Sequence, residues 1–257
     1  MEHVISNIER QQRIQQLISR QQSLSVAEIC EIFDISESTA RRDLEKLADQ
    51  GKIQRVHGGA ISLKQAPPEL PILQRETEQS EEKKKIGLMA ANLVQNGDTV
   101  LLGSGTTVLE VARNLRDRKG LTIITNSLPV MNILSGLPEI SLIALGGMLR
   151  DSELSFIGHI TEQALAEIRV DKVIIGVHAI DPENGLTNDC LQETMTDRSI
   201  IKSGKEVIVV ADHTKINTVS FAFLAPIKNI HKLITDKQTP KDFVNALEDR
   251  DVKVVLV

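Results

Sequence analysis

Apolar residues recur at helical spacing in the first part of the chain. Over residues 7–20 they lie three or four positions apart and predict one helix, whose inner side carries Ile8, Ile14, Leu17 and Ile18. Ser25 and Glu28 have the spacing of a capping box, in which each side chain accepts a hydrogen bond from an unpaired backbone N–H. They predict the start of a second helix, whose inner face we expect to carry Ile29, Ile32 and Phe33.

A third helix is predicted from Ser36, which can cap it, to about Gln50, where Gly51 tolerates the left-handed conformation that ends helices. Two helices separated by so few residues form a helix-turn-helix. At about 100° per residue, one face of the third helix carries Ala40, Leu44 and Leu47. The opposite face carries Ser38, Arg42 and Glu45, and its flanks carry Thr39 and Arg41.

The polar face of this third helix suits the major groove of duplex DNA, because Arg pairs bidentately with guanine and Ser or Thr reaches base edges or phosphates. A surface helix with two solvated arginines explains the same pattern about equally well. Residues 52–61 favour DNA, because two β-prone segments around a Gly-Gly turn predict a basic hairpin, the wing of a winged helix. We expect DNA contacts from Ser36, Ser38, Thr39, Arg41, Arg42, Lys52, Arg55 and His57.

The charge distribution agrees with a DNA-binding first part. The chain has a net charge of −5, but residues 38–64 contain six basic and three acidic residues. Local positive charge of this kind supplies phosphate contacts to a small duplex-DNA reader. The five Phe, with no Trp or Tyr, argue against a protein that stacks single-stranded bases on aromatic rings.

Prolines at 67, 68 and 71 block helix and sheet and predict a linker. We therefore expect a DNA-binding domain over 1–63, a linker over 64–75 and a regulatory domain over 76–257. In the last of these, helices are predicted over 76–94 and 108–115, and strands over 99–102, 121–125, 140–145, 172–177, 207–211, 230–235 and 252–256. This alternation predicts an α/β domain with a mostly parallel sheet covered on both faces.

Ligands of such sheets bind at the carboxyl ends of the strands, where polar loops of this chain collect. The run Ser104, Gly105, Thr106 and Thr107 offers N–H groups and hydroxyls to a phosphate at a helix N-terminus. Lys215 supplies the opposing cation, and Arg150 is the reserve cation. Further candidates are Asn126, Ser127, Gly146, Gly147 and Asp181. Each loop alone is also explained as a simple turn, but five together favour a pocket for a small polyhydroxylated anion.

Other classes of function find little support. Cys30 and Cys190 suggest neither a disulfide framework nor a zinc site, and the six His lack metal-ligand spacing, so we expect no metal and no cofactor. No apolar run approaches the 18 residues of a membrane span. The start of the chain lacks the apolar core of a signal peptide, so we expect a cytoplasmic protein.

The chain resembles the DeoR family of bacterial transcriptional repressors along nearly its whole length. The first part matches in SxxTxRRDL over 36–44 and GKIxRxHGGA over 51–60. The second matches in GTT at 105–107, TNS at 125–127, GG at 146–147, GLT at 185–187 and DxxK at 212–215. The end of the chain and Ser155-Phe156-x-Gly158 look like the amino-sugar branch. The resemblance implies a DNA-binding winged helix and a sugar-phosphate sensor of the ribose-5-phosphate isomerase-like fold.

Departures from the related isomerases favour a sensor over an enzyme. Gly103 stands where the family often has Asp, and His178 stands where the isomerases have a catalytic Asp. The isomerases also have a catalytic Lys beyond the loop that matches Asp181, but no Lys occurs between Asp181 and Lys202. We therefore expect no catalytic residues and a repressor that binds operator DNA as a homo-oligomer, dimer or tetramer. The alternatives are a sugar-phosphate isomerase-like enzyme with an accessory first module, and a winged helix that binds protein instead of DNA.

Overall fold

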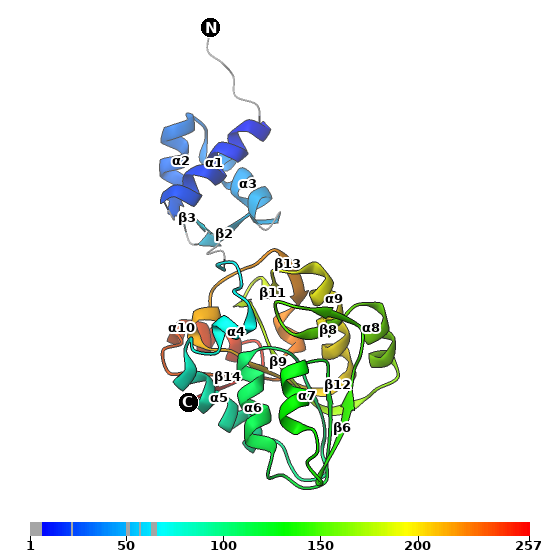
Figure 1. The fold of residues 1–257 in the computed structure, drawn as a ribbon. Coiled ribbons are helices and arrows are strands. Elements are labelled where there is room, and N and C mark those ends of the chain that lie inside the picture. The colour runs from blue at the N-terminus through cyan, green and yellow to red at the C-terminus, as the bar shows by residue number, and fades with distance from the viewer. Residues whose placement is uncertain (1–6, 22, 50–51, 57, 63–65) are drawn as a thin grey trace. The chain divides into compact units, whose positions relative to one another are not determined.

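The computed structural model describes the chain except for residues 1–6, 22, 50–51, 57 and 63–65. Its contacts divide the chain into two units, 1–65 and 66–257 (Figure 1). Four residues of the sequence predictions lie outside the described residues: Gln50, Gly51, His57 and Lys64.

The first unit contains three helices and a small antiparallel sheet. The helices are α1 (Asn7–Gln21), α2 (Val26–Phe33) and α3 (Glu37–Asp49), and the strands are β1 (Ser23–Ser25), β2 (Ile53–Val56) and β3 (Gly59–Ser62), in the order β1-β3-β2. The capping box predicted for α2 is confirmed, since the Ser25 amide donates to Glu28 and the Glu28 amide donates to Ser25. The unit is a winged helix-turn-helix, as the sequence predicts.

The core of the first unit forms where the apolar pattern places it, with two exceptions. The described core includes Ile14, Ile18, Ile29, Ala40, Leu44 and Leu47. The prediction was wrong for Ile8 and Ile32, which are 71% and 50% exposed. Around α2, Ile32 lies about 60° from Ile29 and about 100° from Phe33, at the edge of the buried stripe, and Ile8 belongs to the first turn of α1.

The hairpin differs in detail from the predicted Gly-Gly turn. Gly58 has a positive φ of 84° and belongs to the turn, but Gly59 is already part of β3. A Cβ atom at Gly59 would come within 2.4 Å of the Leu24 carbonyl oxygen on the neighbouring strand. Gly59 therefore permits the close pairing of β3 with β1.

The second unit is built on a seven-stranded sheet, and each pair of neighbouring strands is parallel. Its strands are β4 (Thr99–Leu102), β5 (Leu121–Thr125), β6 (Ile140–Ala144), β9 (Val170–Gly176), β12 (Gly204–Val210), β14 (Lys232–Thr235) and β15 (Lys253–Leu256). The order is β15-β14-β12-β9-β4-β5-β6, so the predicted parallel sheet is confirmed. The direction of winding reverses between β4 and β9, which makes this the switch point of the sheet.

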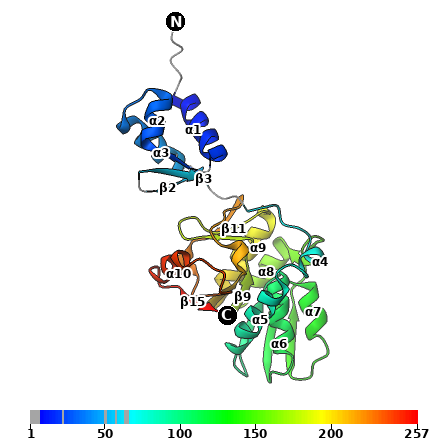
Figure 2. The ribbon, with the colours of Figure 1, turned by 90° about the vertical axis from the view of Figure 1, so that its left-hand side faces the viewer.

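Helices pack on both faces of this sheet. The helices α5 (Ser80–Asn92), α6 (Thr106–Leu115) and α7 (Leu128–Leu134) share one buried cluster and lie side by side in both views (Figures 1 and 2). The helices α8 (His159–Ala166), α9 (Leu191–Ser203) and α10 (Lys241–Glu248) contribute to a second cluster. Successive residues of β4 alternate between the clusters, with Val100 and Leu102 in the first and Leu101 in the second.

Smaller elements complete the second unit. A hairpin joins β7 (Met148–Arg150) and β8 (Ser155–Ile157), and β10 (Ala179–Asp181), β11 (Gly185–Asn188) and β13 (Ala222–Ala225) form an antiparallel sheet. Short helical turns are α4 (Ile72–Arg75), η1 (His213–Lys215) and η2 (Ile227–Asn229). Among the described residues, none of the helices is long and apolar enough to cross a membrane.

Residues 66–75 belong to the second unit, whereas the proline pattern predicts a linker over 64–75. The Ala66 amide donates to the Val219 carbonyl at 2.9 Å, and the Ile72 amide donates to the Ser152 carbonyl at 2.7 Å. Ile72 and Arg75 are 2% and 7% exposed. The prolines keep residues 66–71 out of regular sheet and helix, and α4 begins directly after Pro71, but an extended chain can still pack against the unit.

Candidate functional site

The first candidate site is the outer face of α3 together with β2. Ser38, Arg41 and Arg42 are exposed, and the Arg55 guanidinium donates to the Arg41 carbonyl at 3.3 Å. This contact places the hairpin arginine against α3, so Arg41, Arg42 and Arg55 form one basic surface. Of the other predicted contact residues, Lys52 is exposed and Thr39 is half-buried. His57, the last of the predicted set, is not described.

Ser36 and Asp43 have structural roles at this surface. The Ser36 hydroxyl accepts from the Thr39 amide at 3.3 Å and therefore caps α3. Asp43 is 4% exposed, and its carboxylate accepts from Arg10 at 2.6 Å and from Gln11 at 2.7 Å. The negative charge of Asp43 is thus matched by α1 inside the unit, and the outer face of α3 is more basic than a residue count suggests.

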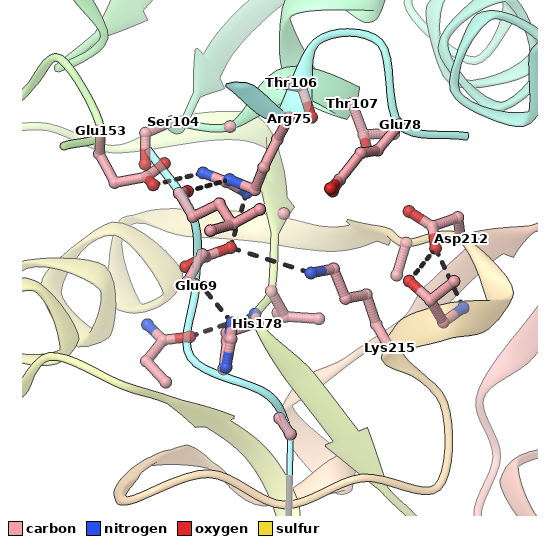
Figure 3. A pocket seen from close by; sticks show the side chains of 18 of the residues that line it. Glu69, Arg75, Glu78, Ser104, Thr106, Thr107, Glu153, His178, Asp212 and Lys215 are labelled. Atoms are coloured by element: carbon pink, nitrogen blue, oxygen red, sulfur yellow. Dashed lines mark hydrogen bonds and ion pairs between the residues drawn. The ribbon is translucent and has the colours of Figure 1, made fainter. Parts of the chain in front are cut away.

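The second candidate site is a pocket of about 630 Å³ in the second unit. It lies at the switch point of the sheet, because its walls include the loops that follow β4, β9 and β12. Residues 66–70, Arg75 and Glu78 close another side (Figure 3). This position agrees with the predicted ligand site at the carboxyl ends of the strands.

Donors for an anion come from the start of α6, which begins at Thr106 and not at 108 as the sequence suggested. Gly105, with φ of 106°, precedes the helix in a conformation that glycine adopts most readily. Ser104, Gly105, Thr106 and Thr107 all line the pocket. The unpaired N–H groups and the dipole of a helix N-terminus favour a negative group there.

Two lysines bring positive charge to the same pocket. Asp212 is 2% exposed and accepts from the Thr214 amide at 3.0 Å, which fixes the turn that holds Lys215. Lys83 of α5 is 5% exposed and donates to the Arg75 carbonyl at 2.8 Å. Burial, together with the charges of Arg75 and Lys215, lowers the pKa of Lys83. A bound anion would relieve this repulsion.

Arg75 stands between two carboxylates at the centre of the pocket wall. Its guanidinium donates to Glu69 at 2.6 Å, to the Leu70 carbonyl at 2.7 Å and to Glu153 (Figure 3). Burial raises the pKa of Glu153 to about 7, against the effect of Arg75. Burial also opposes the ionisation of Glu69, but the contact with His178 and the charges of Arg75 and Lys215 outweigh it and lower the pKa to about 2.

The inner part of the pocket carries polar atoms without hydrogen bonds. Asp197 is 5% exposed, and one of its oxygens accepts from Asn188 at 2.8 Å while the other has no partner among the described residues. His178 is 4% exposed, and its Nδ1 lies 3.4 Å from Glu69 without hydrogen-bond geometry. Burial raises the pKa values of Glu193 and Asp197. These atoms offer hydrogen bonds to a polar ligand.

Six of the predicted effector-binding residues do not line this pocket: Asn126, Ser127, Gly146, Gly147, Arg150 and Asp181. The first four follow β5 and β6, which lie one and two strands beyond β4 on the side away from the switch point. Their positions in the sheet, not their chemistry, remove them from the site.

Each of these six residues makes structural contacts, although the buried Oδ1 of Asn126 has no hydrogen-bond partner among the described residues. Asn126 donates to the Phe156 carbonyl at 3.0 Å, and Ser127 caps α7. The Gly146 carbonyl accepts from Thr161 at 2.8 Å, and Gly147 packs against the same side chain. Asp181 accepts from the Glu183 and Asn184 amides in the β10–β11 turn. Arg150 pairs with Glu193, itself a pocket residue, and with Asp189 at 3.4 Å.

Most of the charged residues of the pocket were not among the predicted site residues, namely Glu69, Arg75, Glu78, Lys83, Glu153, Glu193 and Asp197. Three of these residues could have been found from helical spacing in the sequence: Lys83, Glu193 and Asp197. Lys83 has helical spacing with the buried Ile86, Gly87 and Ala90, and Glu193 and Asp197 have helical spacing with the buried Ile200. Charged residues at core-facing positions of a helix indicate a polar site. Within the described part of the chain, three or more His, Cys, Asp or Glu side chains are nowhere grouped to hold a metal ion.

Comparison with known proteins identifies the domain family of each unit. The family model of the DeoR-like helix-turn-helix domain matches residues 10–66, and that of the DeoR C terminal sensor domain matches residues 78–237. The HTH-type transcriptional regulator YulB of Bacillus subtilis is 36% identical over 97% of this chain and 96% of its own length. The glycerol-3-phosphate regulon repressor of Escherichia coli is 33% identical over 96% of this chain and 98% of its own length.

Among solved structures, ribose 5 phosphate isomerase A from Neisseria gonorrhoeae is similar to 55% of this chain, over 56% of its own length. The TM-score is 0.42 and the sequence identity is 13%.

Proposed function

The chain belongs to the DeoR family of DNA-binding transcriptional regulators, and from this premise we propose that it represses carbohydrate-metabolism genes under the control of a phosphorylated sugar. The observation that carries the proposal is the pocket of the sensor domain, where the N-terminus of α6 faces Lys215 across the switch point. Binding of the sugar phosphate there changes the affinity of the winged helix for operator DNA. A repressor of this kind acts in the cytoplasm, where bacterial DNA lies.

The pocket suits a phosphorylated polyol in two respects. A phosphate needs several N–H donors and a cation when it leaves water, and residues 104–107 with Lys215 provide both. The unpaired Asp197 oxygen and the His178 ring nitrogens provide partners for hydroxyl groups. A relative that is named for the glycerol-3-phosphate regulon agrees with a phosphorylated ligand of small size. A thermal-shift screen of the full chain against sugar phosphates and their parent sugars tests this assignment.

The basic surface of α3 and β2 is expected to bind duplex DNA. Replacing Arg41, Arg42 or Arg55 with alanine should cost about 1–3 kcal/mol where the arginine reads a guanine, and should reduce the salt dependence by about one unit where it contacts a phosphate. Affinity is measured for a duplex that the parent selects from random DNA. Arg116→Ala, an exposed arginine of the second unit, is the control. Parent-like binding by all three variants would show that this surface does not contact DNA.

The proposed sensor binds sugar phosphates without converting them. Aldose–ketose isomerisation needs a base beside the carbonyl carbon. His178 lines the pocket, and the family resemblance implies that it stands where the isomerases carry a catalytic Asp; Asp181 is held in a turn outside the pocket. We expect no turnover above the protein-free background in an isomerisation assay over pentose and hexose phosphates. Saturable turnover that disappears in a His178→Ala variant would support the isomerase-like alternative.

Self-association is expected because each chain has a single DNA-binding domain. Each chain has one recognition helix, and specific operators present two half-sites, so two copies must be joined. An exposed apolar surface of the second unit, which we call the α9–β13 surface, consists of Leu191, Met195, Phe221 and Phe223, each at least 50% exposed. Arg198 of α9 donates to the Phe223 and Leu224 carbonyls and holds the two elements together. We assign this surface to a second copy of the chain.

Charge on the α9–β13 surface should separate the copies. A Met195→Glu or Phe223→Glu variant is expected to sediment as a monomer at concentrations at which the parent is a dimer or tetramer, because a buried unpaired carboxylate is costly. Analytical ultracentrifugation measures the mass. Leu88→Glu, which changes an equally exposed leucine of α5, should assemble like the parent. A monomeric parent, or variants that assemble as it does, would argue against this interface.

A further inference from the structure

The segment that follows the DNA-binding unit passes through the ligand pocket. Residues 66–72, called the strap from here on, are anchored at both ends by the amide hydrogen bonds of Ala66 to Val219 and of Ile72 to Ser152. Between these anchors, residues 66–70 line the pocket. The only side chain of the strap that carries a charge is Glu69. The strap therefore brings one carboxylate to a site that we assign to an anion.

Glu69 contacts three positively charged or protonatable groups. Its carboxylate lies 2.6 Å from Arg75, 3.4 Å from Nδ1 of His178 and 3.9 Å from Nζ of Lys215 (Figure 3). Its side chain is 10% exposed, and its pKa is lowered to about 2, so it is ionised at neutral pH. Glu69 is thus a permanent negative charge within the pocket.

The long contact to Lys215 is the one that a ligand can take over. Arg75 holds Glu69 at hydrogen-bond distance, whereas Lys215 extends toward it without reaching that distance (Figure 3). A phosphate at the N-terminus of α6 carries nearly two charges and gains backbone donors as well, so it attracts Lys215 more strongly than a carboxylate does. A neutral sugar has no charge with which to compete.

We propose that Glu69 is a built-in competitor for Lys215, and that a phosphorylated ligand weakens the hold of the pocket on the strap when it draws Lys215 away. The inference rests on the proposed function. Glu69 then determines specificity, because ligands without a phosphate do not displace it. Coupling between two binding events is reciprocal, so a loosened strap and a bound phosphate favour each other. The strap begins where the DNA-binding unit ends, so ligand binding acts directly on the connection to that unit.

The first test compares Glu69→Gln with the parent, using inorganic phosphate as the probe and calorimetry on the full chain. Removing the competing charge should tighten phosphate binding by about tenfold or more, within the usual range of coupling between sites. The control is Glu78→Gln, which removes a charge from the same pocket but not from Lys215, and its gain should be clearly smaller. Equal increases in phosphate affinity for the two variants would show that Glu69 acts only as one of several negative charges in the pocket, and would overturn the proposal.

The second test needs no variant. Hydrogen–deuterium exchange of the full-length parent should show faster exchange of the Ala66 and Ile72 amides when inorganic phosphate is bound. Unchanged or slower exchange, in a protein that does bind phosphate, would overturn the proposal and leave the proposed function intact. If neither inorganic phosphate nor any sugar phosphate of the screen binds the parent, the proposed function fails and this inference fails with it.

Discussion

Replacing Arg75 with methionine should lower the free energy of unfolding of the second unit by about 3–5 kcal/mol, the usual cost of removing one partner from a buried ion pair. Arg75 is 7% exposed and contacts Glu69, Glu153 and the Leu70 carbonyl. Methionine keeps most of the volume but leaves two buried carboxylates without this cation. Urea unfolding followed by circular dichroism measures the change.

The loss in Arg75→Met should be larger at pH 8 than at pH 5. In the parent, Glu69 has a pKa of about 2, below its ordinary 4.5, so its contribution to stability is complete above pH 4.5 and is lost as pH falls toward 2. Without Arg75 part of this contribution is lost at both pH values, because only the contact with His178 and the charge of Lys215 remain. Glu153, with a pKa raised to about 7, destabilises the folded unit once it ionises, and the variant then has no arginine beside it.

An exposed ion pair provides the control for Arg75. Arg250 pairs with Glu183 on the surface, where such pairs contribute about 0–1 kcal/mol, so Arg250→Met should change stability little at either pH. If Arg75→Met is no more costly than Arg250→Met, the Glu69–Arg75–Glu153 contacts do not stabilise the unit.

Replacing Lys215 with alanine should weaken sugar-phosphate binding by about 1.5–3 kcal/mol, or roughly 10- to 150-fold. Lys215 is the cation opposite the N-terminus of α6, and the phosphate loses its charge-assisted hydrogen bond in the variant. Calorimetry with the tightest ligand of the screen measures the change.

Two comparisons sharpen the Lys215 test. The unphosphorylated parent sugar should bind Lys215→Ala and the parent protein about equally and weakly. Lys205→Ala changes an exposed lysine at the other end of β12 and should leave sugar-phosphate affinity unaltered. Equal binding of the phosphorylated and unphosphorylated ligands by the parent protein would show that residues 104–107 and Lys215 do not hold a phosphate.

The sequence was sufficient where local spacing determines structure. The apolar face of α3, the capping box of α2 and the strands of the parallel sheet all follow from patterns within a few residues. That the start of α6 and Lys215 line one pocket was also predictable, because the end of a parallel strand is visible in the order of elements.

Strand order explains why most of the six predicted residues outside the pocket do not line it. The chain alternates strands and helices identically on both sides of the switch point, so the sequence does not show that β4 neighbours β9 while β5 and β6 lie farther out. The predictions for Asn126, Ser127, Gly146 and Gly147 depended on that order. Glu69 and Arg75 were missed for another reason: their contacts to Glu153, His178 and Lys215 join residues at least 78 positions apart.

The strap also determines which fragment of this protein is fit for study. The family model of the sensor domain covers residues 78–237, and a fragment cut to those bounds lacks the strap, Arg75, α10 and β15. Glu153 would lose its arginine, β14 would become an unprotected edge strand, and the pocket would open on one side. A sensor fragment for crystallisation or ligand screening should therefore begin no later than Ala66 and extend to Val257.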